Sequence, residues 1–107
     1  MDLLKLTPAP WFSHGKQLCQ GTVFAATVIA TFENEEDAKG SALARNAFDV
    51  MMRRGWSSKR HSDQKQWYVD TPTRIPPDGA TTRHEHADPF TALVEADLWY
   101  VKNVEGK

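Results

Sequence analysis

An alternating segment followed at once by a helix start constrains the fold of this chain more than any other feature of its 107 residues. Within residues 21–32, the even positions from Phe24 onward are all apolar, whereas the odd positions include Thr27 and Thr31. A period of two among β-branched and aromatic residues predicts a strand with one face in the core. A strand of this kind next to a helix favours a fold of packed layers.

Residues 35–54 carry helix signals at both ends. Asn34 is a typical N-cap residue, and the acids of the first turn complement the helix dipole. Gly55 stands where this helix would place its C′ glycine. We expect one face of the helix to pack on the strand. Gly40 lies on this face and is expected to allow close contact with Ala26 and Ala30. This face comprises Gly40, Leu43, Ala44, Ala47, Phe48, Val50 and Met51.

The rest of the chain predicts further strands and a second helix. Asp88 and Pro89 form a strong helix start, an N-cap followed by proline, so we expect a helix over residues 89–103. Prolines interrupt the N-terminal part, which is expected to form an irregular flap over residues 1–20. We also expect two short strands, over residues 56–61 and 66–70, and a proline-containing loop over residues 71–87.

Together these elements predict a single domain of the α+β class over residues 1–107. The expected order is β-α-β-β-α. The simplest arrangement is a two-layer sandwich, in which a three- to four-stranded, mainly antiparallel sheet carries both helices on one face. The other face and the edges of such a sheet stay uncovered, which leaves homodimerisation open.

Composition excludes several classes of protein. Lys and Arg number 13 against 14 Asp and Glu, so the chain has no overall basic excess for binding nucleic acid. The single cysteine, Cys19, excludes an internal disulfide and a four-cysteine zinc site. No apolar run approaches the ~20 residues of a membrane helix, and no secretory leader is visible. We therefore expect no membrane association and a cytoplasmic location, or the host cytoplasm for a phage-encoded protein.

Two charged residues fall on the apolar faces of the two predicted helices. Asp97 interrupts the apolar stripe of the second helix, and Arg54 lies on the apolar face of the first helix in its last turn. A buried carboxylate without a partner is costly. We therefore expect Arg54 and Asp97 to form a structural ion pair. The alternative is a shielded acid in a small pocket.

His84, His86 and Asp88 have a spacing typical of metal ligands. In an extended segment these side chains point the same way, and such ligands suit zinc or another divalent ion. The segment resembles the first part of the H-x-H-x-D-H motif of metallo-β-lactamase-type hydrolases, but Pro89 stands at the position of the last histidine. We expect instead a histidine-containing loop, with Asp88 as a helix cap and no bound metal or cofactor. Three further residues, His14, Cys19 and His61, could complete a metal site. Nothing in the sequence places them near His84 and His86.

The strongest local charge cluster lies within residues 45–65, which hold six basic and two acidic side chains. Basic groups contact phosphates and aromatic rings stack on bases, so this composition is typical of a surface that binds a partner or a nucleic acid. The alternative is a solvated hairpin whose tryptophans face the core. The candidate residues are Arg53, Arg54, Trp56, Lys59, Arg60, His61, Lys65, Trp67 and Tyr68.

No glycine-rich phosphate loop or nucleophile motif is visible, so we expect a protein without enzymatic activity. The leading hypothesis is a small binding protein that engages a protein partner, as an inhibitor or regulator of the kind that phages and mobile elements encode. The contrast between the basic cluster and the acidic residues 88–105 favours docking on a charged protein surface. One alternative is a nucleic-acid-binding protein that uses the basic and aromatic residues. Another is a small metal-dependent enzyme built on His84 and His86.

Overall fold

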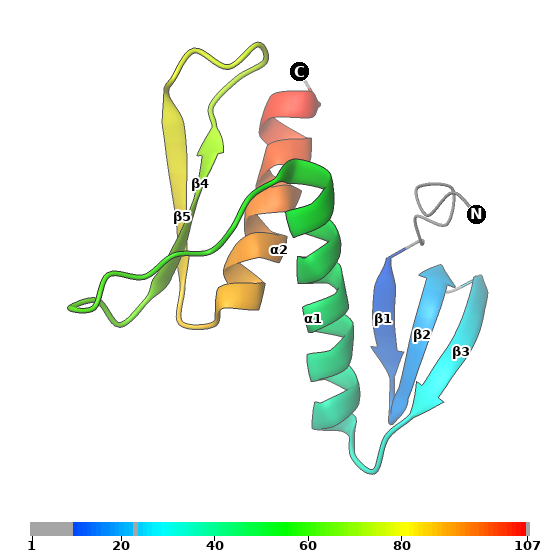
Figure 1. The fold of residues 1–107 in the computed structure, drawn as a ribbon. Helices are drawn as coiled ribbons and strands as arrows, with labels where there is room; N and C mark the ends of the chain where they lie inside the picture. Colours follow the sequence, from blue (N-terminus) through cyan, green and yellow to red (C-terminus); the bar gives the residue numbers. More distant parts are fainter. Residues whose placement is uncertain (1–9, 23, 107) are drawn as a thin grey trace. The chain divides into compact units, whose positions relative to one another are not determined.

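The computed structural model describes residues 10–22 and 24–106. These residues form five strands and two helices, and the second helix continues into a π-helical turn (Figure 1). The chain divides between Asn46 and Ala47 into two compact units. The predicted α+β class, with antiparallel strands and two helices, is confirmed. The single expected sheet is not found, because the described strands pair in a three-stranded and a two-stranded sheet.

The first unit contains the three-stranded sheet, with β1 (Trp11–His14), β2 (Gln17–Thr22) and β3 (Ala25–Thr31) in that order. The predicted flap over residues 1–20 is wrong where the structure can test it, because β1 and β2 begin directly after Pro10 and pair antiparallel. Residues 1–9 of that flap lie outside the described residues. The order of the elements is therefore β-β-β-α-β-β-α.

The predicted strand over residues 21–32 is divided by a tight turn. Gly21 has a φ of 125°, and a Cβ atom there would lie 2.4 Å from the carbonyl oxygen of Ala25. The close approach of the two strands therefore requires glycine at this position. In the described sheet β3 pairs only with β2, so it is an edge strand. The expected burial of one face of β3 is wrong, since only Ala30 within it is even half-buried. Leu18 and Cys19 of the central strand are buried instead.

The helix α1 (Glu35–Arg54) has the predicted bounds and the predicted caps. The Asn34 side chain accepts a hydrogen bond from the backbone N–H of Asp37 at 2.8 Å, and its amide donates to the Asp37 carboxylate at 3.1 Å. At the other end Gly55 has a φ of 74°, and its N–H donates to the carbonyl of Met51 at 2.9 Å. These local contacts satisfy backbone groups that a helix end leaves unpaired.

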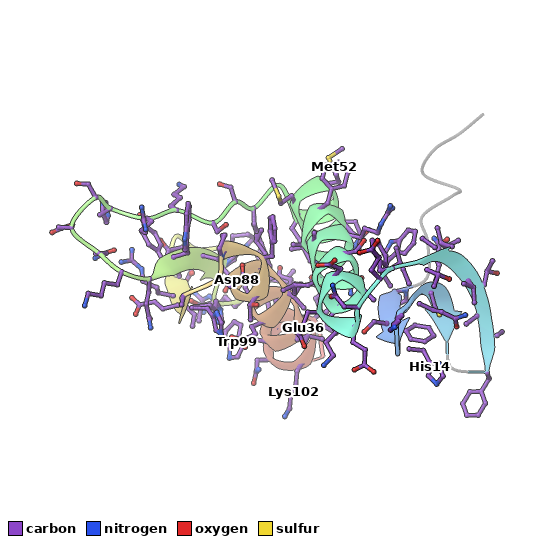
Figure 2. All side chains as sticks on the ribbon, turned by 90° about the horizontal axis from the view of Figure 1, so that it is seen from below. His14, Glu36, Met52, Asp88, Trp99 and Lys102 are labelled. Atoms are coloured by element: carbon purple, nitrogen blue, oxygen red, sulfur yellow. The ribbon has the colours of Figure 1, made fainter. Side chains whose placement is uncertain are left out.

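The predicted buried face of α1 is only partly correct. Ala47 and Val50 are buried, but Phe48 is 61% exposed. Gly40 does not contact Ala26 or Ala30, since a Cβ atom at residue 40 would meet no atom within 4 Å. In the first half of α1, the buried positions are the small residues Ala38 and Ala42. Met51 and Met52 are exposed, and the Met52 side chain projects away from the helix (Figure 2).

The second unit pairs β4 (Trp67–Pro72) with β5 (Thr81–His86) in an antiparallel hairpin, next to α2 (Pro89–Tyr100) and the π-helical turn η2 (Val101–Glu105). Its core joins β4, α2 and the last turns of α1. The clustered residues are Ala47, Val50, Val69, Ala92, Leu93 and Ala96. None of the helices among residues 10–22 and 24–106 is long and apolar enough to cross a membrane.

Two sequence predictions in this unit need correction. Residues 56–61 do not form a strand and contribute only an isolated bridge between Lys59 and Tyr68. Residues 71–87 are not one loop, because β4 extends to Pro72 and β5 occupies residues 81–86. The polar β5 alternates between exposed and half-buried residues, a pattern of period two that contains no apolar side chain. The expected second helix is present as α2 and η2.

Candidate functional site

Arg54 and Asp97, which the sequence analysis expected to meet, are in contact. The Nε atom of Arg54 lies 2.9 Å from Oδ1 of Asp97, and both side chains are largely buried, at 18% and 14% exposure. Arg54 also pairs with Glu105 of η2. Arg53 bridges Asp49 at 2.7 Å and Asp97 at 3.2 Å. Burial lowers the pKa of the Arg54 guanidinium, but hydrogen bonds to Glu105 and Asp97 outweigh it, so the pKa is raised.

Aromatic rings complete this cluster. The guanidinium of Arg54 lies 4.7 Å from the ring centroid of Tyr100 and 5.5 Å from that of Trp56. The two rings meet edge to face, with 5.2 Å between centroids. Three candidates for partner binding, Arg53, Arg54 and Trp56, are therefore engaged in packing and charge neutralisation within the second unit.

The remaining basic candidates lie together on one exposed stretch. Residues 59–65, which we call the basic segment, carry the exposed side chains of Lys59, Arg60, His61 and Lys65. Lys59 is fixed beside β4 by two backbone hydrogen bonds with Tyr68, at 2.9 and 2.7 Å. The bridge therefore anchors the start of this segment at the sheet edge.

The two aromatic candidates of β4 are covered by cationic and histidine side chains. The guanidinium of Arg60 lies 5.3 Å from the centroid of the Trp67 ring. Tyr68 is 8% exposed, because the Arg83 guanidinium lies 4.0 Å from its ring centroid and the His61 ring stacks on it at 5.5 Å. Tyr68 Oη also lies 3.3 Å from Nε2 of His61.

Charge neutralisation separates the basic segment from the other arginines of the second unit. Arg83 forms two hydrogen bonds with Asp70, at 3.0 and 3.2 Å, and Arg74 lies 2.6 Å from Asp78. Arg53 and Arg54 have the acidic partners described above. In contrast, none of the cations of the basic segment has an ion pair with a described residue. The segment thus retains an unneutralised positive charge.

A cavity of about 160 Å³ opens beside the start of the basic segment. It is lined by Gly55, Trp56, Ser57, Lys59, Tyr68 and Asp70. Gly55 shapes one wall, because its positive φ turns the chain out of α1. Ser57 and Asp70 were not among the candidates predicted from the sequence, nor was Arg83, which holds the Asp70 carboxylate. The alternation of exposed residues in β5 could have identified Arg83 as a cross-strand partner of Asp70.

The three metal candidates make other contacts. His84 Nε2 lies 3.1 Å from the hydroxyl of Thr71. His86 Nδ1 accepts a hydrogen bond from the backbone N–H of Asp88 at 2.9 Å. The Asp88 carboxylate caps α2, as predicted, by accepting from the Phe90 N–H and the Thr91 hydroxyl. Among the described residues, which include His14, Cys19 and His61, no three His, Cys, Asp or Glu side chains are placed to hold a metal ion.

His84 makes the stability of the second unit depend on pH. Burial between the sheet and α2, where its ring lies 5.0 Å from that of Trp99, lowers the pKa of His84 below its ordinary value of 6.5, although Asp70 and Glu95 oppose the shift. The unfolded chain then binds more protons than the folded chain near and below pH 6.5, so stability falls as pH decreases through this range. We expect this loss to be smaller in His84→Gln when urea unfolding is measured from pH 7.5 to pH 5. An unchanged pH dependence in the variant would show that His84 is not responsible.

Comparison of the chain with known protein families, curated proteins and solved structures finds no match. The function is therefore argued from the geometry of the site itself.

Proposed function

We propose that this chain is a small non-enzymatic binding protein that docks an acidic protein partner on the basic segment, residues 59–65. One observation carries the proposal. The arginines elsewhere in the described second unit are paired with carboxylates, whereas Lys59, Arg60 and Lys65 are exposed and have no acidic partner among the described residues. Complementary charge on a partner would neutralise them and guide its approach.

The cavity beside Lys59 supports the same surface. Its volume suits a single side chain, and its lining combines the aromatic residues Trp56 and Tyr68 with the Ser57 hydroxyl. A recess of this kind next to a charged rim is the usual place for an anchoring residue of a partner. We expect the partner to contribute one apolar or aromatic side chain to the cavity and carboxylates to the rim. Docking of this kind would inhibit or regulate the partner protein in the cytoplasm.

The covered aromatic rings favour a protein partner over a single-stranded nucleic acid. Binding to single strands depends on open ring faces on which bases stack, beside cations that follow the backbone. Here Arg60 covers Trp67, and Arg83 and His61 cover Tyr68. Stacking of a base would require these side chains to leave their present contacts.

A binding assay with defined probes tests this proposal. We expect a fluorescein-labelled glutamate-rich peptide with one tryptophan to bind, and its affinity to fall as salt is added. Lys59→Glu/Arg60→Glu should weaken binding about tenfold or more, since complementary charges become repulsive. The matched control is Lys39→Glu/Lys102→Glu, which makes the same change in net charge at exposed positions that are not part of the segment. Lys102 projects from η2 (Figure 2).

The control should retain binding close to that of the unmodified protein. Equal weakening in both double variants would show that only the total charge matters, and would contradict a site on the basic segment. Tighter binding of an oligothymidylate than of the glutamate-rich peptide would favour the nucleic-acid alternative instead.

A further inference from the structure

The two edges of the three-stranded sheet differ in how their backbone groups are satisfied. At the β1 edge, the Asn46 side chain acts as a substitute strand. Its Oδ1 atom accepts a hydrogen bond from the N–H of Trp11 at 2.9 Å, and its Nδ2 atom donates to the carbonyl of Trp11 at 2.8 Å. Arg45 covers the same residue, with its guanidinium 4.5 Å from the Trp11 ring centroid. These contacts occupy the outward backbone groups of Trp11 and obstruct the addition of a strand at this edge.

Along residues 26–31, the β3 edge has no comparable cover from the described residues. Within the described part of the chain, the outward backbone groups of residues 26–31 have no hydrogen-bond partner beyond β2. The strand contains no charged residue and no proline, which are the features that usually protect an edge. Apolar side chains are exposed along it, with Val28 at 51% and Ile29 at 45%, and Phe24 just before it at 96%.

The first unit has a small core, so the pairing of another strand with β3 would add to its stability. Its buried apolar residues in the described chain are Leu18, Cys19, Ala38 and Ala42, and all but Leu18 have small side chains. Units of this size with so few large buried side chains commonly depend on association for stability. An additional strand on β3 would satisfy its backbone and cover Val28 and Ile29.

We propose that β3 pairs antiparallel with β3 of a second copy of this chain, which gives a two-fold dimer with a continuous six-stranded sheet. An uncharged strand can lie against itself without like-charge repulsion, and β-branched residues suit cross-strand pairs. Asn46 obstructs the same pairing at Trp11 on the other edge, so we expect association to stop at two copies. Ile29 is a β-bulge and has no partner residue in β2. The regular part of β3 therefore lies on the N-terminal side of Ile29. Pairing of this part with its copy places Thr27 near the two-fold axis.

Sedimentation velocity over micromolar to millimolar concentrations tests the dimer. The apparent mass should rise from 12.1 kDa to about twice that value as the concentration increases. Thr27→Lys brings two like charges together near the axis and should keep the protein monomeric. The control His14→Lys places a lysine on the exposed end of β1 and should dimerise as the unmodified protein does.

Amide hydrogen exchange checks the same contact without any substitution. Exchange of residues 26–28 should slow as the protein concentration rises, while exchange in β1 stays constant. A protein that remains monomeric at millimolar concentration, a Thr27→Lys variant that still dimerises, or growth beyond two copies would each overturn the proposal. None of these results depends on the basic segment, so this proposal and the proposed function can fail separately.

Discussion

We expect the replacement of Asp97 by alanine to lower the free energy of unfolding, measured by urea denaturation, by about 2 kcal/mol. Asp97 is the shared partner of Arg53 and Arg54, and its side chain is 14% exposed. Without it, Arg54 keeps only Glu105 as a partner while its guanidinium stays largely buried between aromatic rings. Removing one member of a buried ion pair costs more than the pair contributes, because the remaining charge is left uncompensated.

Asp63→Ala is the control, since Asp63 is exposed and takes part in no ion pair within the described chain. We expect its free energy of unfolding to stay within about 0.5 kcal/mol of the original. Arg54→Met in the Asp97→Ala background should recover part of the loss, because it removes the stranded charge. If Asp63→Ala and Asp97→Ala are equally stable, the cluster does not stabilise the fold.

Leu93→Ala has the largest expected effect, a loss of about 3 kcal/mol in the free energy of unfolding. Leu93 is 1% exposed and belongs to the cluster in which α2 packs with β4 and the last turns of α1. Truncation removes apolar burial and leaves a cavity that the neighbouring Val69 and Ala96 are too constrained to fill.

Leu98→Ala provides a matched comparison, because it makes the same chemical change in the same helix at a residue that is 64% exposed. Its expected cost is below about 1 kcal/mol in the same urea measurement. If the two variants lose similar amounts of unfolding free energy, Leu93 does not lie on the buried face of α2.

Features that depend on neighbouring residues could be predicted from the sequence. The bounds of α1 follow from Asn34 and Gly55, which act within one helical turn. The Asp88 cap of α2 is equally local. The contact between Arg54 and Asp97 was predictable for a different reason: each is the charge that does not fit the apolar face of its own helix, and the simplest solution is that they meet.

Features that depend on strand pairing could not be predicted in the same way. The alternation within residues 21–32 is real, but it does not show that the chain turns back between β2 and β3 or that β3 lies at an edge. The strand β5 contains no large apolar residue, so its sequence indicates a loop rather than a strand. Both errors arise because hydrogen bonds to a paired strand, rather than side-chain hydrophobicity alone, decide the structure of these segments.

In the candidate site, too, local features could be predicted from the sequence, whereas contacts between distant residues could not. Its cations were apparent from composition, but which of them are neutralised depends on acids that lie far along the sequence. Arg54 is separated from Glu105 by 51 positions, and Arg83 from Asp70 by 13. The fold thus divides one basic cluster into a structural group around Arg54 and an unneutralised group on the basic segment.

A titration of ¹⁵N-labelled protein with the glutamate-rich peptide tests the central claim most directly. If the unneutralised cations of residues 59–65 form the docking surface, the largest chemical-shift changes will fall on that segment and on the Trp56 and Tyr68 residues that line the cavity. Changes of equal size at Lys102, or spread evenly over the exposed lysines and arginines, would contradict the claim.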